Sequence, residues 1–102
     1  MPTTPKISSA QRKWLRGQAH SLKPIVQIGK QGLSESALRQ VDEALEAHEL
    51  IKVQAVAPRE EKDAIAERLA EQLRADVAGR IGHIIILFRQ NPDPEKQVYE
   101  LP

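Results

Sequence analysis

Helix-like segments alternate with short strand-like segments along this chain, and their order limits the fold more than any other feature. Apolar residues at helical spacing, each run preceded by a capping residue or a proline, predict three helices. Short runs rich in β-branched residues predict the strands. The predicted order is a helix over 9–20, a strand over 25–28, a helix after the N-cap residue Ser34, a strand over 50–56, a helix opened by Pro58, and strands over 77–80 and 83–89.

A strand, a helix and a second strand in succession prefer a right-handed crossover, which makes the two strands parallel. The last two strands are joined by a short turn at Ile81-Gly82, so they can pair only as an antiparallel hairpin. The last strand is apolar enough to be buried on both faces. A chain of 102 residues suits one core and one domain. We therefore predict a single compact α/β domain, α-β-α-β-α-β-β, with helices packed on a mixed four-stranded sheet.

The two ends of the chain are rich in proline. Residues 1–7 contain Pro2 and Pro5 and are predicted to be a flexible N-terminal tail. Residues 91–102 contain three prolines and are predicted to be a C-terminal tail that trails along the surface. The folded domain is therefore expected to span residues 8–90.

The segment Gly29-Lys30-Gln31-Gly32 is a GxxG loop between a predicted strand and a predicted helix start. Glycine has no Cβ, so the backbone can take positive φ and come close to a ligand. The free N–H groups of the following helix point back at the loop and favour an anion. The functional interpretation is a phosphate held by Lys30 and the loop amides, and the alternative is a tight turn. The spacing fits neither a P-loop nor a dinucleotide fingerprint.

Charge is distributed very unevenly along the chain. The overall net charge is +1, but residues 1–34 carry six cations and no acid, a net charge of +6. Residues 35–102 carry nine cations and fourteen acids, a net charge of −5. Such a basic segment is typical of a surface that meets phosphate, although a solvated basic face is the alternative. Beside the loop, the candidate phosphate contacts are Arg12, Lys13, Arg16, His20 and Lys23.

Trp14 is the only tryptophan, and two environments are open to it. It can stack on an unpaired base, as in single-strand readers, or it can pack in the core. Its neighbours Lys13 and Leu15 point to opposite faces, so the sequence does not settle the direction of its side chain; of the two environments we favour packing. His48-Glu49 begins like the zinc motif HExxH, but Lys52 stands where the second histidine is needed.

Several classes of protein are disfavoured by the composition. The chain has no cysteine, which excludes disulfides and thiolate metal sites and suits a reducing cytoplasm. The longest apolar run, at 84–88, is far too short to span a membrane. No pair of carboxylates or activated nucleophile is recognisable. We therefore expect a cytoplasmic, non-enzymatic monomer with no metal, cofactor, membrane or small-molecule substrate.

Three stretches of the sequence carry a family resemblance: Gly17-Gln18-Ala19-His20, the run from Leu22 to Leu33, and the run from Ala44 to Val53. Their LKP strand, GxxG loop and HELIKV segment resemble the CRM domain, the chloroplast RNA splicing and ribosome maturation domain. In bacteria this domain is known as the stand-alone YhbY-type RNA-binding protein. The resemblance extends from about Ser8 to Arg89, which makes 8–90 a CRM-like RNA-binding domain.

The resemblance implies a fold similar to the C-terminal domain of translation initiation factor three. It also implies RNA binding through Gly29, Lys30, Gln31 and Gly32 and the adjacent basic surface. The implied partner is RNA, either large-subunit rRNA or a pre-ribosomal particle.

Two functions of different classes remain. The first is a non-catalytic RNA-binding protein that contacts the rRNA backbone and assists assembly of the large ribosomal subunit. The second is a protein–protein adaptor whose acidic helices dock a basic ribosomal protein.

Overall fold

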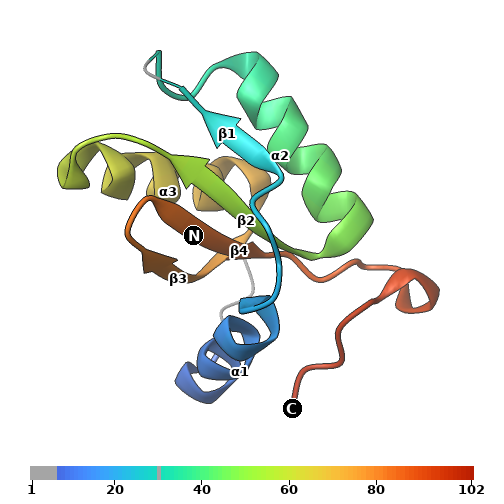
Figure 1. Ribbon diagram of the computed structural model, residues 1–102. Helices are drawn as coiled ribbons and strands as arrows, with labels where there is room; N and C mark the ends of the chain where they lie inside the picture. The colour runs from blue at the N-terminus through green and yellow to red at the C-terminus, as the bar shows by residue number, and fades with distance from the viewer. Residues whose placement is uncertain (1–6, 30) are drawn as a thin grey trace.

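The computed structural model describes residues 7–29 and 31–102. The predicted order of α-helices and strands is confirmed in these residues, and each of them lies within a few residues of its predicted place, whereas a short 3₁₀ helix near the C-terminus was not predicted (Figure 1). The helices and strands are α1 (Ser9–Ala19), β1 (Val26–Ile28), α2 (Glu35–His48), β2 (Leu50–Ala55), α3 (Arg59–Leu73), β3 (Asp76–Ile81), β4 (Ile84–Phe88) and the short 3₁₀ helix η1 (Pro94–Lys96). The tail predicted over 1–7 lies outside the described residues except for Ile7, which is buried.

The strands form one mixed four-stranded sheet in the order β1-β2-β4-β3. β1 pairs with β2 in parallel, and β4 is antiparallel to both β2 and β3. β2 and β3 therefore run in the same direction, as the crossover rule predicts, but β4 lies between them. The most apolar strand thus takes a central position, where both of its faces are covered.

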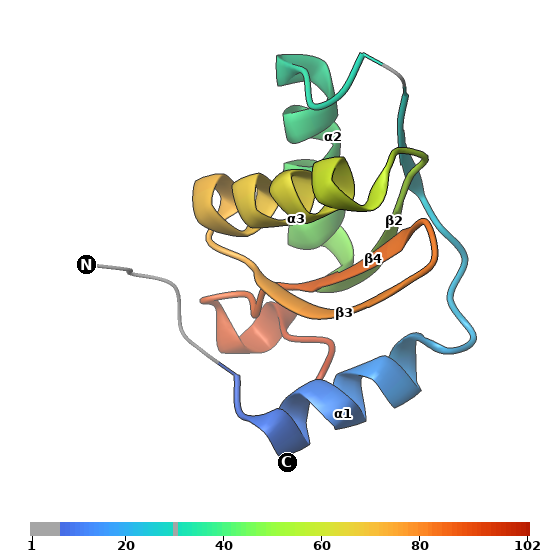
Figure 2. The same ribbon diagram turned by 90° about the vertical axis from the view of Figure 1, so that its left-hand side faces the viewer.

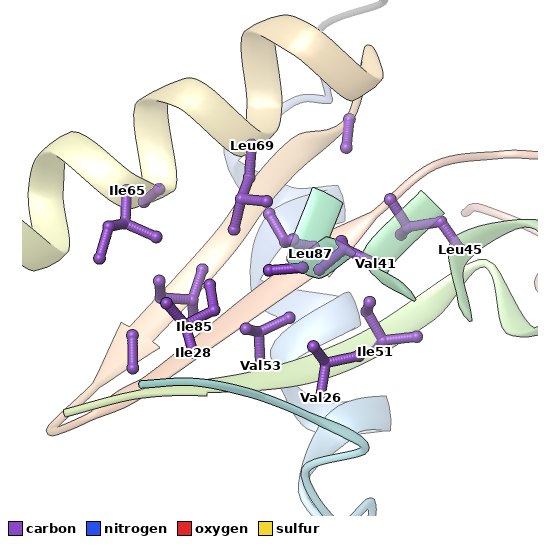
Figure 3. Packing of buried hydrophobic residues seen from close by; sticks show 14 residues of the cluster. Val26, Ile28, Val41, Leu45, Ile51, Val53, Ile65, Leu69, Ile85 and Leu87 are labelled. Atoms are coloured by element: carbon purple, nitrogen blue, oxygen red, sulfur yellow. The ribbon is translucent and has the colours of Figure 1, made fainter. Parts of the chain in front are cut away.

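Helices cover both faces of the sheet, so the domain has three layers (Figure 2). α2 and α3 cover one face, where Val41, Leu45 and Leu69 pack against the strands (Figure 3). From β4, Ile85 and Leu87 belong to this larger cluster. Because strand side chains alternate between faces, the residues between them in β4 point to the opposite side of the sheet.

A second cluster lies under α1, on the other face of the sheet. Leu15 and Ala19 of α1 are fully buried there, against Ile86 and Phe88 of β4. Trp14 packs at its border, with its ring in edge-to-face contact with Tyr99 at a centroid separation of 6.4 Å. This contact agrees with the prediction that Trp14 packs against the protein.

A β-bulge in β3 shapes the seat of α1. Val77 pairs with Leu87 and Gly79 pairs with Ile86, so Ala78 is the extra residue. A bulge turns two successive residues toward the same face. Ala78 and Gly79 are both small, so α1 can approach β3 closely. A Cβ at Gly79 would lie 2.5 Å from Cδ of Arg16.

The C-terminal segment 91–102 folds back against α1 and the end of α2 (Figure 1). The carboxylate of Glu49 is almost completely buried. It accepts hydrogen bonds from the backbone N–H groups of Asn91 at 2.6 Å, Val98 at 2.7 Å and Tyr99 at 2.9 Å. At the far end, the side chain of Gln11 donates to the carbonyl of Pro102 at 3.2 Å. This segment is therefore an ordered part of the α1 layer.

Candidate nucleic-acid interface

The loop that joins β1 to α2 places a turn at the N-terminus of a helix. The N–H of Gly32 donates to the carbonyl of Gly29 at 3.0 Å, and Gly32 has φ of +80°. Of the two glycines of the motif, only Gly32 takes the positive φ that glycine permits. Ser34 then caps α2 through a 3.1 Å hydrogen bond from the N–H of Ala37. Lys30 lies outside the described residues.

The loop is open toward solvent. A Cβ built at Gly29 or at Gly32 would have no neighbouring atom within 4 Å. The glycines therefore serve the conformation of the turn and leave room above its backbone. That room is what a phosphate needs in order to reach backbone N–H groups at a helix N-terminus.

A polar hollow of about 370 Å³ adjoins the loop on the side of α2. Amides and hydroxyls line much of it, from Gln27, Gln31, Ser34, Ser36 and Gln40. These groups donate and accept hydrogen bonds without carrying a negative charge, which suits a ribose or a phosphate. Sequence reasoning missed Gln27, Ser36 and Gln40. Two sequence patterns could have indicated them. Gln27 alternates with the apolar residues of its strand, and Ser36 and Gln40 are spaced one helical turn apart.

A second hollow of about 370 Å³ lies on the other side of the loop, toward the start of α3. Its lining includes Pro58, Ile65 and His83, and also the carboxylate of Glu61. A negative charge in the lining makes this side less suited to phosphate than the hollow beside α2.

The two arginines of α1 point toward the sheet. Arg16 donates from Nη1 to the carbonyl of Ala78, the bulged residue, at 3.1 Å. Nε of Arg12 is buried and has no hydrogen-bond partner among the described residues. Burial raises the pKa of Asp76 above its usual value, while the nearby positive charge of Arg12 lowers it. Arg16 thus links α1 to β3 by a hydrogen bond while remaining exposed, and Arg12 is half-buried near Asp76 of β3.

The remaining predicted contacts are exposed but spread out. Lys13 lies on α1, His20 at its C-terminal end, and Lys23 in the segment leading to β1. In Figure 2 this segment and then β1 run along one side of the domain, from α1 at one end to the GxxG loop at the other. Lys52 of β2 anchors it by donating to the carbonyl of Leu22 at 2.9 Å. These exposed residues therefore follow the course of the chain from α1 toward the loop, and this course is called the track below.

Two further features bear on the kind of site. Among the described residues, no three His, Cys, Asp or Glu side chains gather as they would around a metal ion. None of the helices in residues 7–29 and 31–102 combines the length and the apolar character needed to cross a bilayer.

Comparison with known proteins identifies the family. Residues 7–89 match the model of the CRS1 / YhbY (CRM) domain. The Probable RNA-binding protein YqeI of Bacillus subtilis is 40% identical over 97 residues, which cover 94% of this chain and 99% of the relative. An RNA-binding protein of Haemophilus influenzae is 39% identical over 93 residues, with 90% and 94% covered.

A solved structure supports the same assignment. The solution structure of the hypothetical protein SAV1595 from Staphylococcus aureus superposes with a TM-score of 0.82 at 36% identity. The alignment covers 95% of this chain and all of that one. Both the sequence match and the fold thus extend over nearly the whole domain, and the chain belongs to the CRS1 / YhbY (CRM) domain family.

Proposed function

We propose that this protein is a non-catalytic RNA-binding protein that holds the RNA backbone at the GxxG loop and along the adjoining edge of the domain. The observation that carries the proposal is the open turn at Gly29–Gly32, set at the capped N-terminus of α2 beside a polar hollow. The names of two relatives, Probable RNA-binding protein YqeI and RNA-binding protein, support the same class of ligand.

The residues along the track would contact the RNA backbone in different ways. Gly29 and Gln31 would offer backbone N–H groups, Gly32 would hold the turn through its positive φ and its hydrogen bond to Gly29, and Lys30 would add a positive charge within the same loop. Lys23, His20 and Lys13 would continue the track toward α1. Arg12 and Arg16 contribute positive potential from the side of the sheet, since both are engaged at the α1–β3 contact. Backbone contacts of this kind supply affinity and position without reading sequence.

We place this activity in assembly of the large ribosomal subunit, with rRNA or a pre-ribosomal particle as the partner. This assignment comes from the family resemblance, and RNA backbone recognition does not depend on it. The adaptor alternative is less favoured, because several acids of α2 and α3 serve the fold. Asp42 pairs with Arg89 at 2.7 Å, Asp63 pairs with Arg80, and Glu46 accepts from the side chain of Asn91 at 2.8 Å.

The salt dependence of RNA binding tests the backbone contact. Each phosphate neutralised on single-stranded RNA contributes about −0.7 to the slope of log affinity against log salt, so about five contacts predict a slope of roughly −3.5. Lys30→Glu should weaken binding to all sequences and reduce the steepness by about 0.7. The matched control is Arg68→Glu on the exposed surface of α3, which should leave the slope unchanged.

Two outcomes would overturn the proposal: a nearly flat slope for the unaltered protein, or equal losses from the Lys30 and Arg68 variants. Crosslinking in cells then identifies the RNA. Recovery of large-subunit rRNA supports the assembly role, and recovery of unrelated RNA leaves RNA binding in place but removes that role.

A further inference from the structure

An apolar groove of about 260 Å³ lies along the track, between the segment leading to β1 and the C-terminal segment. Leu22 and Ile25 form one side, and Val98 and Tyr99 form the other. Its floor comes from the beginning of β2. Ile25 is 52% exposed and Val98 is 59% exposed, so large apolar side chains stand open to solvent at this place.

The wall made by Val98 and Tyr99 is held in position before any ligand arrives. Both residues donate their backbone N–H groups to the same buried oxygen, Oε1 of Glu49. Glu49 itself has φ of +63°, an uncommon conformation for a residue with a side chain. Backbone outliers of this kind are found where the surrounding structure holds a functional shape. The ring of Tyr99 is further steadied by its edge-to-face contact with Trp14.

The charge of the groove lining favours an anionic ligand. Lys23 supplies a positive charge beside the imidazole of His48, and no carboxylate lines the groove among the described residues. The carboxylate of Glu49 lies beneath the wall and is occupied by three backbone N–H groups. Lys23 also belongs to the proposed phosphate track. A strand of RNA that follows the track therefore passes the mouth of the groove.

We propose that the groove takes one unpaired base of the bound RNA, which lies between Tyr99 and the apolar side chains of Leu22 and Ile25 while Lys23 contacts the adjoining phosphate. This inference rests on the proposed function, since it assigns a base site to the same RNA. Aromatic and apolar contact with the face of a base tolerates every base. The groove adds affinity for single-stranded RNA without requiring a fixed sequence.

The test combines protein variants with abasic RNA. A single-stranded oligonucleotide is compared with versions that lack one base at each position in turn. In the unaltered protein, one abasic position should lower affinity by at least about fivefold, the lower end of what one stacked base contributes. Tyr99→Ala should lower affinity for the intact RNA by a similar factor and abolish the additional cost of that abasic position. The conservative Tyr99→Phe should behave as the unaltered protein.

A second variant controls for the possibility that Tyr99→Ala disturbs the fold through the lost contact with Trp14. Ile25→Ala changes a half-exposed side chain and should also reduce the cost of the abasic position. The slope with salt should stay the same in both variants, because the phosphate contacts are retained.

The two proposals fail in different ways. If the unaltered protein binds RNA with a steep salt slope but the abasic position costs the same in both variants as in the unaltered protein, the base site is wrong and backbone binding stands. If the unaltered protein shows no affinity for single-stranded RNA, both are wrong. If Tyr99→Ala leaves RNA affinity intact and instead abolishes binding of a ribosomal protein, the groove is a protein-docking site and the base proposal is overturned.

Discussion

Glu49 shows how much a single residue can organise in a small domain. It ends α2, begins the turn into β2, and directs its carboxylate inward to three backbone N–H groups. A buried carboxylate is tolerated only when its hydrogen bonds are satisfied, and these bonds satisfy it with backbone rather than with a cation. The segment that contains Tyr99 is therefore fixed by one side chain that lies fifty residues earlier in the chain.

Glu49→Gln keeps the shape of the side chain and removes one of its two acceptors. The new amide N–H group would face a backbone N–H group, either that of Asn91 or those of Val98 and Tyr99. We expect the free energy of unfolding to fall by about 1–3 kcal/mol. Urea unfolding measures this loss, and amide hydrogen exchange should quicken at the freed residues. Glu43→Gln, exposed on α2, is the control, and equal stability of the two variants would contradict the clamp.

Asp76 and Arg12 give a prediction for pH. Burial raises the pKa of Asp76, so the folded state holds a proton that the unfolded state releases. The free energy of unfolding therefore falls as pH rises from the usual carboxyl value to the raised one. The positive charge of Arg12 opposes the increase in the pKa of Asp76. Arg12→Gln removes that charge, so this pKa should increase further and stability should be lost over a wider range of pH.

Side-chain carbon NMR of Asp76 measures that titration directly. The control is Lys13→Gln, the next residue on the helix and an exposed one, which should leave the midpoint in place. An unchanged Asp76 midpoint in the Arg12 variant would show that the guanidinium does not act on this carboxyl group.

Among the elements, the contact of α1 with β3 depends on a bulge that sequence patterns do not reveal. Ala78 and Gly79 together present almost no side chain, so the helix and the arginine it carries lie close to the strand. The carbonyl of Ala78 accepts its hydrogen bond from Arg16. Helical periodicity places Arg16 on the outer face of α1, but its side chain packs against β3 of the sheet.

Gly79→Ala tests this contact. The added Cβ would collide with Cδ and Cγ of Arg16, so the arginine must move and the carbonyl of Ala78 loses its donor. We expect a loss of about 1–3 kcal/mol in thermal or urea unfolding. Gly17→Ala in α1 is the matched control, because its Cβ meets nothing within 4 Å and should stabilise the helix by roughly 0.5–1 kcal/mol. A Gly79→Ala protein as stable as the unaltered one would refute the close approach.

Across the whole molecule, local signals were sufficient for the elements and insufficient for their mutual contacts. The capping residues Ser8 and Ser34 mark helix starts that the structure has at the same places. The insertion of β4 between β2 and β3 depends on pairing between distant segments, which no local pattern encodes. The turn of the GxxG loop could be predicted, because glycines between a strand and a helix indicate a tight change of direction. The inward direction of Arg12 could not, because long side chains can reach around a helix to a neighbouring strand.

The layer under α1 also has a consequence for synthesis of the chain. α1 leaves the ribosome before the rest of the folded domain, yet its buried partners Ala78, Ile86 and Phe88 come from the last quarter of the sequence. Tyr99 and Leu101, which complete its cover, are made later still. During translation the apolar side of α1 therefore stays uncovered until β3 and β4 have been made. The cover of this cluster is complete only after the segment that ends at Leu101 has left the exit tunnel.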